Sequence, residues 1–443
     1  MSAKTPQENL FDLYFKYVEE SESPMIFHRW SLIASVSALL GRSCWLPHGT
    51  NRFFPNMYVM LIGDPGTRKS SAIKGARKLL SHSGYETFAA EKTTKEKFLL
   101  DLEGLPETYG ESNYVAKSGR RADTSKMLTP EDVLRNLDLT TDHDGTPREV
   151  FICADEFNEF AGSGNLDFLS LLGSLWDWDD ELAPYKHRLK NSKSLAIYQP
   201  TISLLGGNTH AGFKSAFPIE AIGQGFMSRL LLVYGEPSGR KIAFPSKPPE
   251  ELGARICEYL KTIATTVKGE VTLTVEARRA LEMIYSAWQP IDDYRYKHYS
   301  TRRFTHLLKL LMVVAAMRLS TEISQPDVVL ANTILTYTES FMSKAMGEFG
   351  KSRNSEATQT IMSTLYEAKK PLSFEDLWKV VNRDLEKRDA LSEILQSLLQ
   401  AGKIQPPDPK AGKHAGFMAL QKPLVAKALY VDYRVLQEMK GKV

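Results

Sequence analysis

A lysine and a serine that follow a glycine-rich turn are the first residues whose types and spacing indicate chemistry. Residues 57–74 read MYVMLIGDPGTRKSSAIK, with Lys69 and Ser70 directly after the turn. The apolar run at 58–62 predicts a buried strand, and the residues after Ser70 have helical periodicity. A strand, a glycine-rich loop, a Lys-Ser pair and a helix form, in this order, a phosphate-binding loop.

Such a loop binds the phosphates of ATP together with Mg²⁺. Backbone N–H groups of the loop and the dipole of the following helix favour a polyphosphate. We expect Lys69 to reach the β- and γ-phosphates and the Ser70 hydroxyl to bind Mg²⁺. The predicted nucleotide-binding residues are Gly63, Asp64, Pro65, Gly66, Thr67, Arg68, Lys69, Ser70 and Ser71.

One position departs from the usual motif, because Arg68 stands where a glycine normally precedes the lysine. That position must tolerate a side chain, which we expect to point away from the nucleotide. The alternative interpretation is a chance Gly/Pro turn before a surface helix. The strand and the helix lie where the motif requires them, which favours the phosphate-binding loop.

Two adjacent carboxylates follow a second apolar strand. Residues 149–160 read EVFICADEFNEF, which places Asp155 and Glu156 at the carboxyl end of a strand at 150–154. Ligands of open α/β sheets bind at that end. We expect Asp155 to hold Mg²⁺ through water and Glu156 to polarise the attacking water, because phosphoryl transfer depends on positioning and charge compensation. An acidic strand end is common by itself, and the preceding phosphate-binding loop makes it specific.

Asn208 and Arg229 are weaker candidates at the ends of two later strands. Asn208 comes just after the apolar strand at 201–206, where an amide can hold the lytic water or simply cap a turn. Arg229 precedes the apolar strand at 230–234. A surface ion pair is the ordinary role of such an arginine, and an arginine finger for a neighbouring subunit is the alternative.

Two basic clusters leave their roles open. Arg302 and Arg303 begin a helix, where they either face the γ-phosphate or cap the helix in solvent. Residues 185–198 predict a basic hairpin, which either contacts DNA phosphates or is simply solvated. The irregular segment at 106–148 is either functional or disordered. The candidate DNA-binding residues of the hairpin are Lys186, Arg188, Lys190 and Lys193.

Composition describes a globular chain with room for several domains. The 443 residues are 42% hydrophobic and carry a net charge of only +3, so any nucleic-acid-binding surface must be local. The three cysteines lie far apart in apolar contexts, which fits a reducing cytosol. No signal peptide and no apolar stretch long enough for a membrane span are expected. We therefore expect a cytoplasmic protein that does not enter a membrane.

The chain divides into four predicted parts. A helical leader at 1–56 precedes an α/β core at 57–245, and a helical lid follows at 246–350. Residues 351–443 predict helix-helix-helix-strand-loop-strand, the order of a winged-helix domain, which binds DNA in some proteins and protein partners in others.

Several of these blocks resemble the minichromosome maintenance (MCM) replicative helicases, a branch of the AAA+ ATPases. The resemblance extends over about residues 55–345. The matching blocks are the phosphate loop Gly63 to Ser70 (GDPGTRKS), the Walker B block Ile152 to Phe157 (ICADEF), Asn208 at the sensor 1 position, the arginine-finger block Met227 to Leu230 (MSRL), the sensor 2 helix beginning at Arg302, and residues 323–328 (ISQPDV).

The resemblance implies an AAA+ P-loop NTPase core that uses ATP and Mg²⁺. It implies a ring, expected to be a hexamer, in which Glu156 and Asn208 act in cis and Arg229 acts on the ATP of the next subunit. The basic hairpin falls where these helicases grip DNA largely without sequence preference. The large N-terminal DNA-binding region of cellular MCM proteins has no counterpart in this sequence. The compact layout of the sequence is more similar to that of replication ATPases of phages and other mobile elements.

The expected function is therefore an ATP-driven DNA helicase or translocase in the cytoplasm of a bacterial host cell. A primase, loader or origin-binding protein is a further expected partner. One alternative is a loader or initiator that assembles another replication protein on DNA. Another is a defence or regulatory ATPase whose winged helix holds a protein partner.

Overall fold

The computed structural model describes most of the chain in two compact units. The described residues are 9–104, 147–179, 183–187, 195–217, 225–291, 293–347, 353–368, 370–382, 385, 387–400, 404–407, 416–420, 430–432 and 434–435. The first unit takes in Met1–Glu282, His298–Ala345 and Tyr430–Val443, and the second takes in Met283–Lys297 and Met346–Leu429.

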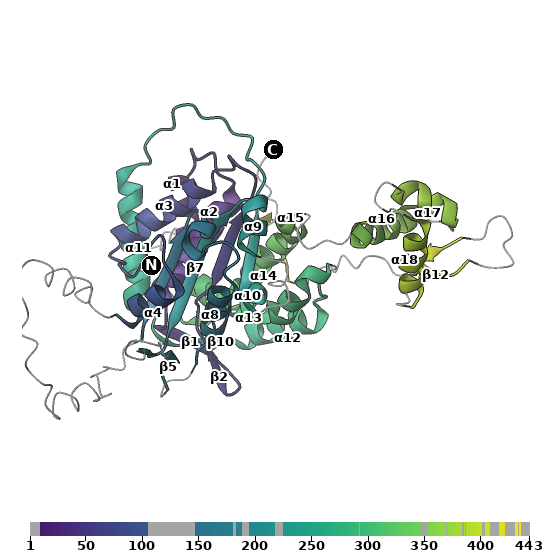
Figure 1. Cartoon of the computed structure of the whole chain (residues 1–443). Helices are drawn as coiled ribbons and strands as arrows, with labels where there is room; N and C mark the ends of the chain where they lie inside the picture. The colour runs from purple at the N-terminus through teal and green to yellow at the C-terminus, as the bar shows by residue number, and fades with distance from the viewer. Residues whose placement is uncertain are drawn as a thin grey trace, which may run out of the picture. The chain divides into compact units, whose positions relative to one another are not determined.

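A four-stranded parallel sheet lies at the centre of the first unit (Figure 1). Its order is β4-β7-β3-β8, and Phe88 adds an isolated parallel bridge to Phe151 of β4. The strands read as nearly continuous apolar runs because helices cover both faces of a parallel sheet. The strands are β3 (Tyr58–Ile62), β4 (Glu149–Ala154), β7 (Thr201–Asn208) and β8 (Leu230–Tyr234).

The register of the strands brings the chemical candidates to one edge. Ile62 of β3 lies opposite Asn208 of β7 and Tyr234 of β8. The strands therefore end together, and the loop that begins at Gly63 leaves the sheet beside Asn208. Ala154, the last residue of β4, pairs with Gly206 of β7, so Asp155 follows at the same edge.

Consecutive glycines of β7 show that helices pack on both faces of the sheet. A Cβ atom added at Gly206 would lie 3.4 Å from the Phe157 ring of α7 (Phe157–Ala161), and one added at Gly207 would lie 3.1 Å from Ile73 of α3 (Lys69–His82). Neighbouring strand residues face opposite sides of a sheet. The close approach on both sides explains why this stretch carries no side chains.

The predicted leader is part of the core. Helix α2 (Met25–Leu40) contacts α3 and the strands β3, β7 and β8. Nearly all its residues are buried, as is typical of a helix that is apolar all round. Helix α1 (Leu10–Tyr17) begins at Asn9, whose side chain accepts a hydrogen bond from the Phe11 N–H, and packs against α2 and α11 (Glu250–Thr266).

The predicted lid at 246–350 contacts the core through several of its helices. Helix α11 contacts α1, α2 and α3, and the α13 residue His306 bonds to the Ser228 carbonyl through Nε2 (3.0 Å). Trp30 of α2 also donates to Thr338 of α14 (2.8 Å). Apart from 283–297 and the residues after Ala345, the predicted lid thus belongs to the same compact unit as the sheet. Of the predicted last part at 351–443, the described residues 430–432 and 434–435 belong to the first unit, where Asp432 N–H donates to Thr333 (2.9 Å).

Smaller elements complete the described part of the first unit. Strands β1, β2 and β9 form one small sheet, β10 pairs with β11, and β5 pairs with β6. The remaining elements are β1 (Cys44–His48), β2 (Asn51–Phe53), α4 (Lys95–Glu103), α8 (Leu166–Leu175), β5 (Tyr185–His187), β6 (Leu195–Ile197), α9 (His210–Ala216), α10 (Gly225–Arg229), β9 (Gly269–Glu270), β10 (Thr272–Leu273), α13 (Lys297–Ala316), β11 (Glu322–Ile323) and α14 (Gln325–Glu339). Helices α12 (Val275–Ala287) and α15 (Met342–Met346) each cross a boundary between the units, as does α13 at its first residue, Lys297. The 3-10 helix η2 (Tyr294–Tyr296) lies in the second unit.

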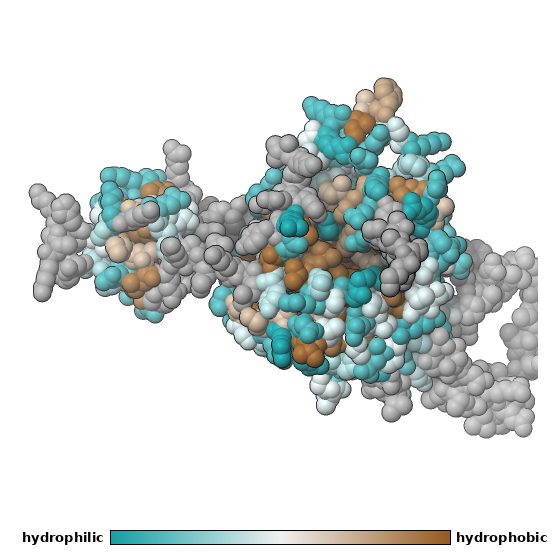
Figure 2. All heavy atoms as spheres, turned by 180° about the vertical axis from the view of Figure 1, so that it is seen from behind, coloured by the Kyte–Doolittle hydropathy of each residue, from teal (hydrophilic) through white to brown (hydrophobic). Residues whose placement is uncertain are grey.

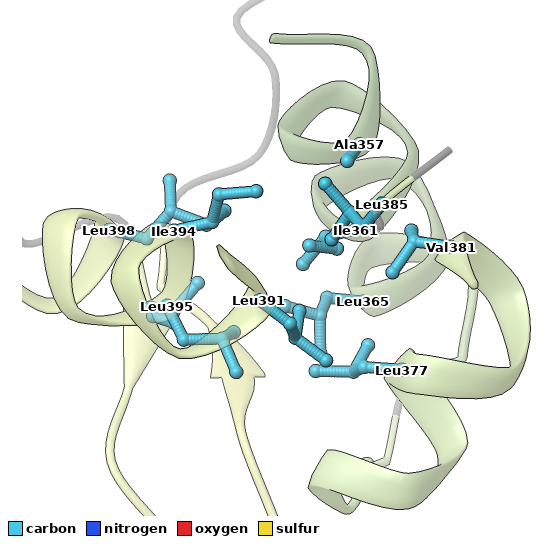
Figure 3. Close-up of a cluster of buried hydrophobic side chains, with 11 residues drawn as sticks. Ala357, Ile361, Leu365, Leu377, Val381, Leu385, Leu391, Ile394, Leu395 and Leu398 are labelled. Carbon is cyan, nitrogen blue, oxygen red and sulfur yellow. The ribbon is translucent and has the colours of Figure 1, made fainter. Parts of the chain in front are cut away.

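The second unit contains the predicted order of three helices and two strands. Helices α16 (Arg353–Ala368), α17 (Phe374–Val381) and α18 (Arg388–Gln400) precede β12 (Ile404–Gln405) and β13 (Met418–Ala419), which pair antiparallel. Their apolar side chains converge on one core (Figure 3). A capping box of Ser373 and Asp376 begins α17, as the sequence pattern of a helix start requires.

No helix in the described part of the chain is long and apolar enough to cross a membrane. The face shown in Figure 2 mixes hydrophilic residues with several separate apolar patches. The segment between β8 and α11 projects at the top of Figures 1 and 2.

Candidate nucleotide site and arginine cluster

The predicted phosphate-binding loop forms a tight turn between β3 and α3. Thr67 donates to the Asp64 carbonyl through both its N–H (3.2 Å) and its hydroxyl (2.9 Å). A Cβ atom at Gly63 would lie 2.8 Å from both the Gly235 carbonyl oxygen and Thr67 Oγ1. Gly66 has φ +87°, in the region that favours glycine. The turn therefore needs glycine at both positions.

The Lys69 ammonium lies inside this turn. Its Nζ donates to the carbonyls of Gly63 (2.8 Å) and Asp64 (3.0 Å), and it lies 3.2 Å from Thr67 Oγ1. Burial lowers the pKa of Lys69, while Glu156 and Asp64 act to raise it. The loop thus holds a positive charge at the amino end of α3, where the helix dipole also favours an anion.

Arg68 leaves the loop toward the leader. Its guanidinium pairs with Glu22 (2.8 Å), whose other oxygen accepts the Ile242 N–H (2.8 Å). The backbone of Arg68 is left-handed, with φ 58°. A side chain is tolerated here because it extends across the surface to Glu22 rather than into the turn.

The two carboxylates after β4 have different surroundings. Asp155 forms an ion pair with Lys74 of α3 (2.7 Å). Glu156 is exposed, and desolvation raises its pKa while the Lys69 charge lowers it. Glu156 and Lys69 are thus within electrostatic reach of each other. Glu156 thus interacts with the loop lysine, and Asp155 contacts the same helix α3 through Lys74.

Asn208 lies at the end of β7. Its side chain is fully buried. Its Nδ2 donates to Asn158 Oδ1 (2.9 Å), and its Oδ1 accepts the Thr209 N–H (3.0 Å). The amide therefore caps the end of β7 and fixes the turn that follows Glu156. These contacts agree with the turn-capping alternative, and the contact of Asn208 with water or phosphate stays a prediction.

Arg229 lies at the opposite edge of the sheet from the loop. It directly precedes β8, whose last residue, Tyr234, pairs with Ile62 at the end of β3. A strand of five residues spans about 16 Å. Arg229 therefore does not approach the loop of its own chain.

Arg302 lies in the same cluster as Arg229. Both guanidiniums lie over the Trp176 ring, at 5.9 Å and 6.0 Å from its centroid. Asp177 pairs with Arg302 (3.2 Å) and with the buried Lys309 (3.5 Å). Burial and the neighbouring Arg302 lower the pKa of Arg229. Among the described residues, Asp177 thus pairs with Arg302 and Lys309 and interacts electrostatically with Arg229. One described carboxylate therefore faces three basic side chains, an arrangement that fits an anion.

Arg303 does not belong to this cluster, and its assignment as a catalytic residue is corrected. Its side chain is 3% exposed and pairs with Glu339, 7% exposed, at 2.9 Å. It also donates to Asn332 Oδ1 (2.8 Å). These contacts hold Arg303 between α13 and α14, where it stabilises the helix pair.

The basic hairpin is described only at its base. Lys186 is exposed on β5, which pairs with β6, and Glu103 of α4 accepts the Ala196 N–H (2.9 Å). The predictions for Arg188, Lys190 and Lys193 fall outside the described residues, as does the stretch 105–146 of the irregular segment.

Four residues of the site were not predicted from the sequence. Lys74 follows Ser70 by four residues, a spacing that places both on one helix face. The position of Lys74 near the site could therefore have been predicted from this spacing. Glu22, Asn158 and Asp177 gave no local signal, because their partners lie far away in the sequence.

The donor set around α3 fits Mg²⁺. A serine hydroxyl at position 70 and the Asp155 carboxylate are hard oxygen ligands, and Mg²⁺ bound to a nucleotide needs only one or two such protein groups. No cluster of three or more His, Cys, Asp or Glu side chains occurs among the described residues.

The fold and site define a mixed α/β protein whose parallel sheet is compatible with a P-loop-like core. Comparison with models of protein families and with curated proteins found no match to this chain.

Proposed function

We propose that this chain is an ATP-driven, ring-forming DNA helicase or translocase of the AAA+ class. The observation that carries the proposal is that the charged groups lie at opposite ends of the parallel strands of one sheet. Lys69 and Glu156 lie at the carboxyl edge, while Arg229 lies at the amino edge. A second copy that faces this loop with the end of its sheet where the strands begin would add its Arg229 and complete the site.

Each side chain has a distinct task in ATP hydrolysis. Lys69 compensates the charge of the β- and γ-phosphates, and Ser70 and Asp155 hold Mg²⁺, which would screen the phosphate charge. Glu156 orients and polarises the attacking water. Arg229 and Arg302 of the neighbouring copy stabilise charge on the γ-phosphate, the role of an arginine finger. Hydrolysis then depends on assembly.

Two features support DNA as the molecule on which the ATP-driven protein moves. Lys186 is exposed on β5, so the base of the hairpin already presents a cation to solvent. The second unit has three helices followed by an antiparallel strand pair, the order of a winged helix. Lysines bind backbone phosphates largely without sequence preference, and such binding weakens with salt.

A loader or initiator that assembles another replication protein is the second candidate. The same ATP site serves both functions. Strand separation on a tailed DNA fork by the purified protein alone supports the helicase. ATP-dependent DNA binding without strand separation supports the loader.

A mixing experiment tests the shared site. Glu156→Gln removes the water-polarising group of a copy, and Arg229→Ala removes its finger, so each variant alone should lose most DNA-stimulated ATPase activity. In mixed rings, some interfaces combine the intact Glu156 of one copy with the intact Arg229 of the other. We expect mixing to restore part of the activity.

The control is a mixture of Glu156→Gln with a double variant that carries both changes, which should stay inactive. If Arg229→Ala alone retains full turnover, or if mixing restores nothing, the shared site is wrong.

A further inference from the structure

Four consecutive residues, 176–179, connect the arginine cluster with the basic hairpin. We call them the linking segment. Residues 42–56 supply a partner for three of the four residues, and Arg302 supplies the partner of Asp177, so the two halves of the segment are held by one set of neighbours. The contacts are Asn56 Nδ2 to the Trp176 carbonyl (3.0 Å), Arg302 to Asp177 (3.2 Å), Arg42 to the Trp178 carbonyl (2.8 Å) and Arg52 to Asp179 (3.0 Å).

The first half of the segment faces the arginines. The Trp176 ring is buried at 1% exposure and lies beneath the guanidiniums of Arg229 and Arg302. Lys309 Nζ lies 4.5 Å from the same ring. Asp177 supplies the carboxylate that these cations share. Cations over an indole face are attracted to it, so this half fixes where the arginines point.

The second half of the segment faces the hairpin. The Trp178 ring meets the Tyr185 ring edge to face, with centroids 5.8 Å apart and an interplanar angle of 83°. Tyr185 begins β5 and directly precedes Lys186. Aromatic pairs of this geometry are stabilised beyond their buried area. A displacement of β5 is therefore transmitted to Trp178, one residue from Asp177.

We propose that the linking segment couples the arginine cluster to the hairpin, with Asp177 as the positioning residue for Arg229 and Arg302 and Trp178 as the contact that transmits the movement. This inference rests on the proposed function. The γ-phosphate of ATP bound to the neighbouring copy would compete with Asp177 for Arg229 and Arg302. Release of Asp177 loosens the segment, and Trp178 passes the change to the hairpin.

The first experiment compares ATPase activity with and without single-stranded oligo-dT. Trp178→Ala removes the ring contact but keeps the backbone carbonyl that Arg42 binds. We expect basal ATPase activity and oligo-dT affinity to stay near those of the wild type, while stimulation by oligo-dT falls about tenfold, within the usual range of coupling energies. Trp178→Phe keeps an aromatic ring and should retain most stimulation. Full stimulation in Trp178→Ala overturns the inference.

The second experiment needs no activity. Asp177→Asn removes the charge at nearly constant shape. We expect hydrogen exchange of the β5 and β6 amides to become about tenfold faster, because local opening is governed by such contacts. Asp167→Asn is the matched control, since Asp167 pairs only at the surface with Lys95 (3.4 Å, 87% exposed). Unchanged exchange in Asp177→Asn overturns the inference.

The two experiments separate the inference from the proposed function. A wild type that hydrolyses no ATP, but in which Asp177→Asn still speeds hairpin exchange, refutes the function and supports the physical link. A DNA-stimulated wild type whose Trp178→Ala variant is equally stimulated supports the function and refutes the link.

Discussion

Lys74 shows how one residue can set the metal requirement of the site. Its ammonium contacts Asp155 at 2.7 Å, and Asp155 is the carboxylate assigned to Mg²⁺. The hydrogen bond to Asp155 raises the pKa of Lys74, so the pair persists at neutral pH. Under the proposed function, the Lys74 ammonium would therefore compete with Mg²⁺ and its bound water for the Asp155 carboxylate.

Replacing Lys74 should make Mg²⁺ easier to bind. Lys74→Gln frees the Asp155 carboxylate, and since an exposed ion pair contributes little, we expect the Mg²⁺ concentration for half-maximal ATP binding to fall about two- to fivefold. The measurement is a Mg²⁺ titration of the binding of a fluorescent ATP analogue. Lys78→Gln, one turn along α3, is the control and should not change the midpoint. A higher Mg²⁺ requirement in Lys74→Gln would contradict this role.

The helix pair α13–α14 depends on one buried ion pair. Arg303 and Glu339 are nearly inaccessible to solvent, so removal of one partner leaves the other charge uncompensated. Arg302, one residue earlier, has 34% of its side chain exposed. We therefore expect substitution of Arg303 to affect mainly folding stability and substitution of Arg302 to affect mainly the proposed ATP hydrolysis.

Arg303→Met should lower the free energy of unfolding by about 3–5 kcal/mol, the usual effect of breaking a buried pair. Arg302→Met should cost about 1 kcal/mol or less, since its pair is partly solvated, while lowering ATPase activity. Urea unfolding followed by circular dichroism, alongside turnover at a temperature where each variant is folded, distinguishes them. Equal loss of stability in both variants would show that Arg303 is not the structural member of the pair.

The difference between Arg302 and Arg303 also shows where sequence reasoning stops. The strands and the phosphate-binding loop could be predicted, because buried parallel strands are continuous apolar runs and the turn at Gly63 has no room for a side chain. The choice between two consecutive helical arginines depends on the rotation of α13 against its neighbours, which no local pattern gives. The packing partner of α11 is likewise not given by its sequence, because an amphipathic helix has the same apolar pattern whether it packs in a lid or against the core.

At the scale of the whole molecule, the division of charge between the two edges of the sheet predicts that nucleotide drives assembly. In the described part of the chain, the cluster of Arg229, Arg302 and Lys309 has one carboxylate, Asp177, for three basic side chains. Under the proposed function, a nucleotide held by Lys69 in another copy would supply further negative charge. The contact forms only between chains, because Arg229 and the loop of one chain lie at opposite edges of the sheet.

We therefore expect a non-hydrolysable ATP analogue with Mg²⁺ to shift the protein from small species to a closed ring, read by mass photometry. Arg229→Ala should raise the protein concentration needed for assembly about thirtyfold or more, because truncation of a charged partner at an interface typically costs about 2 kcal/mol or more. Lys214→Ala, a change of an exposed cation on α9, serves as the control for net charge. Ring formation that is equally strong without nucleotide, or in Arg229→Ala, would mean that other surfaces hold the copies together and that the arginine cluster has a different anion.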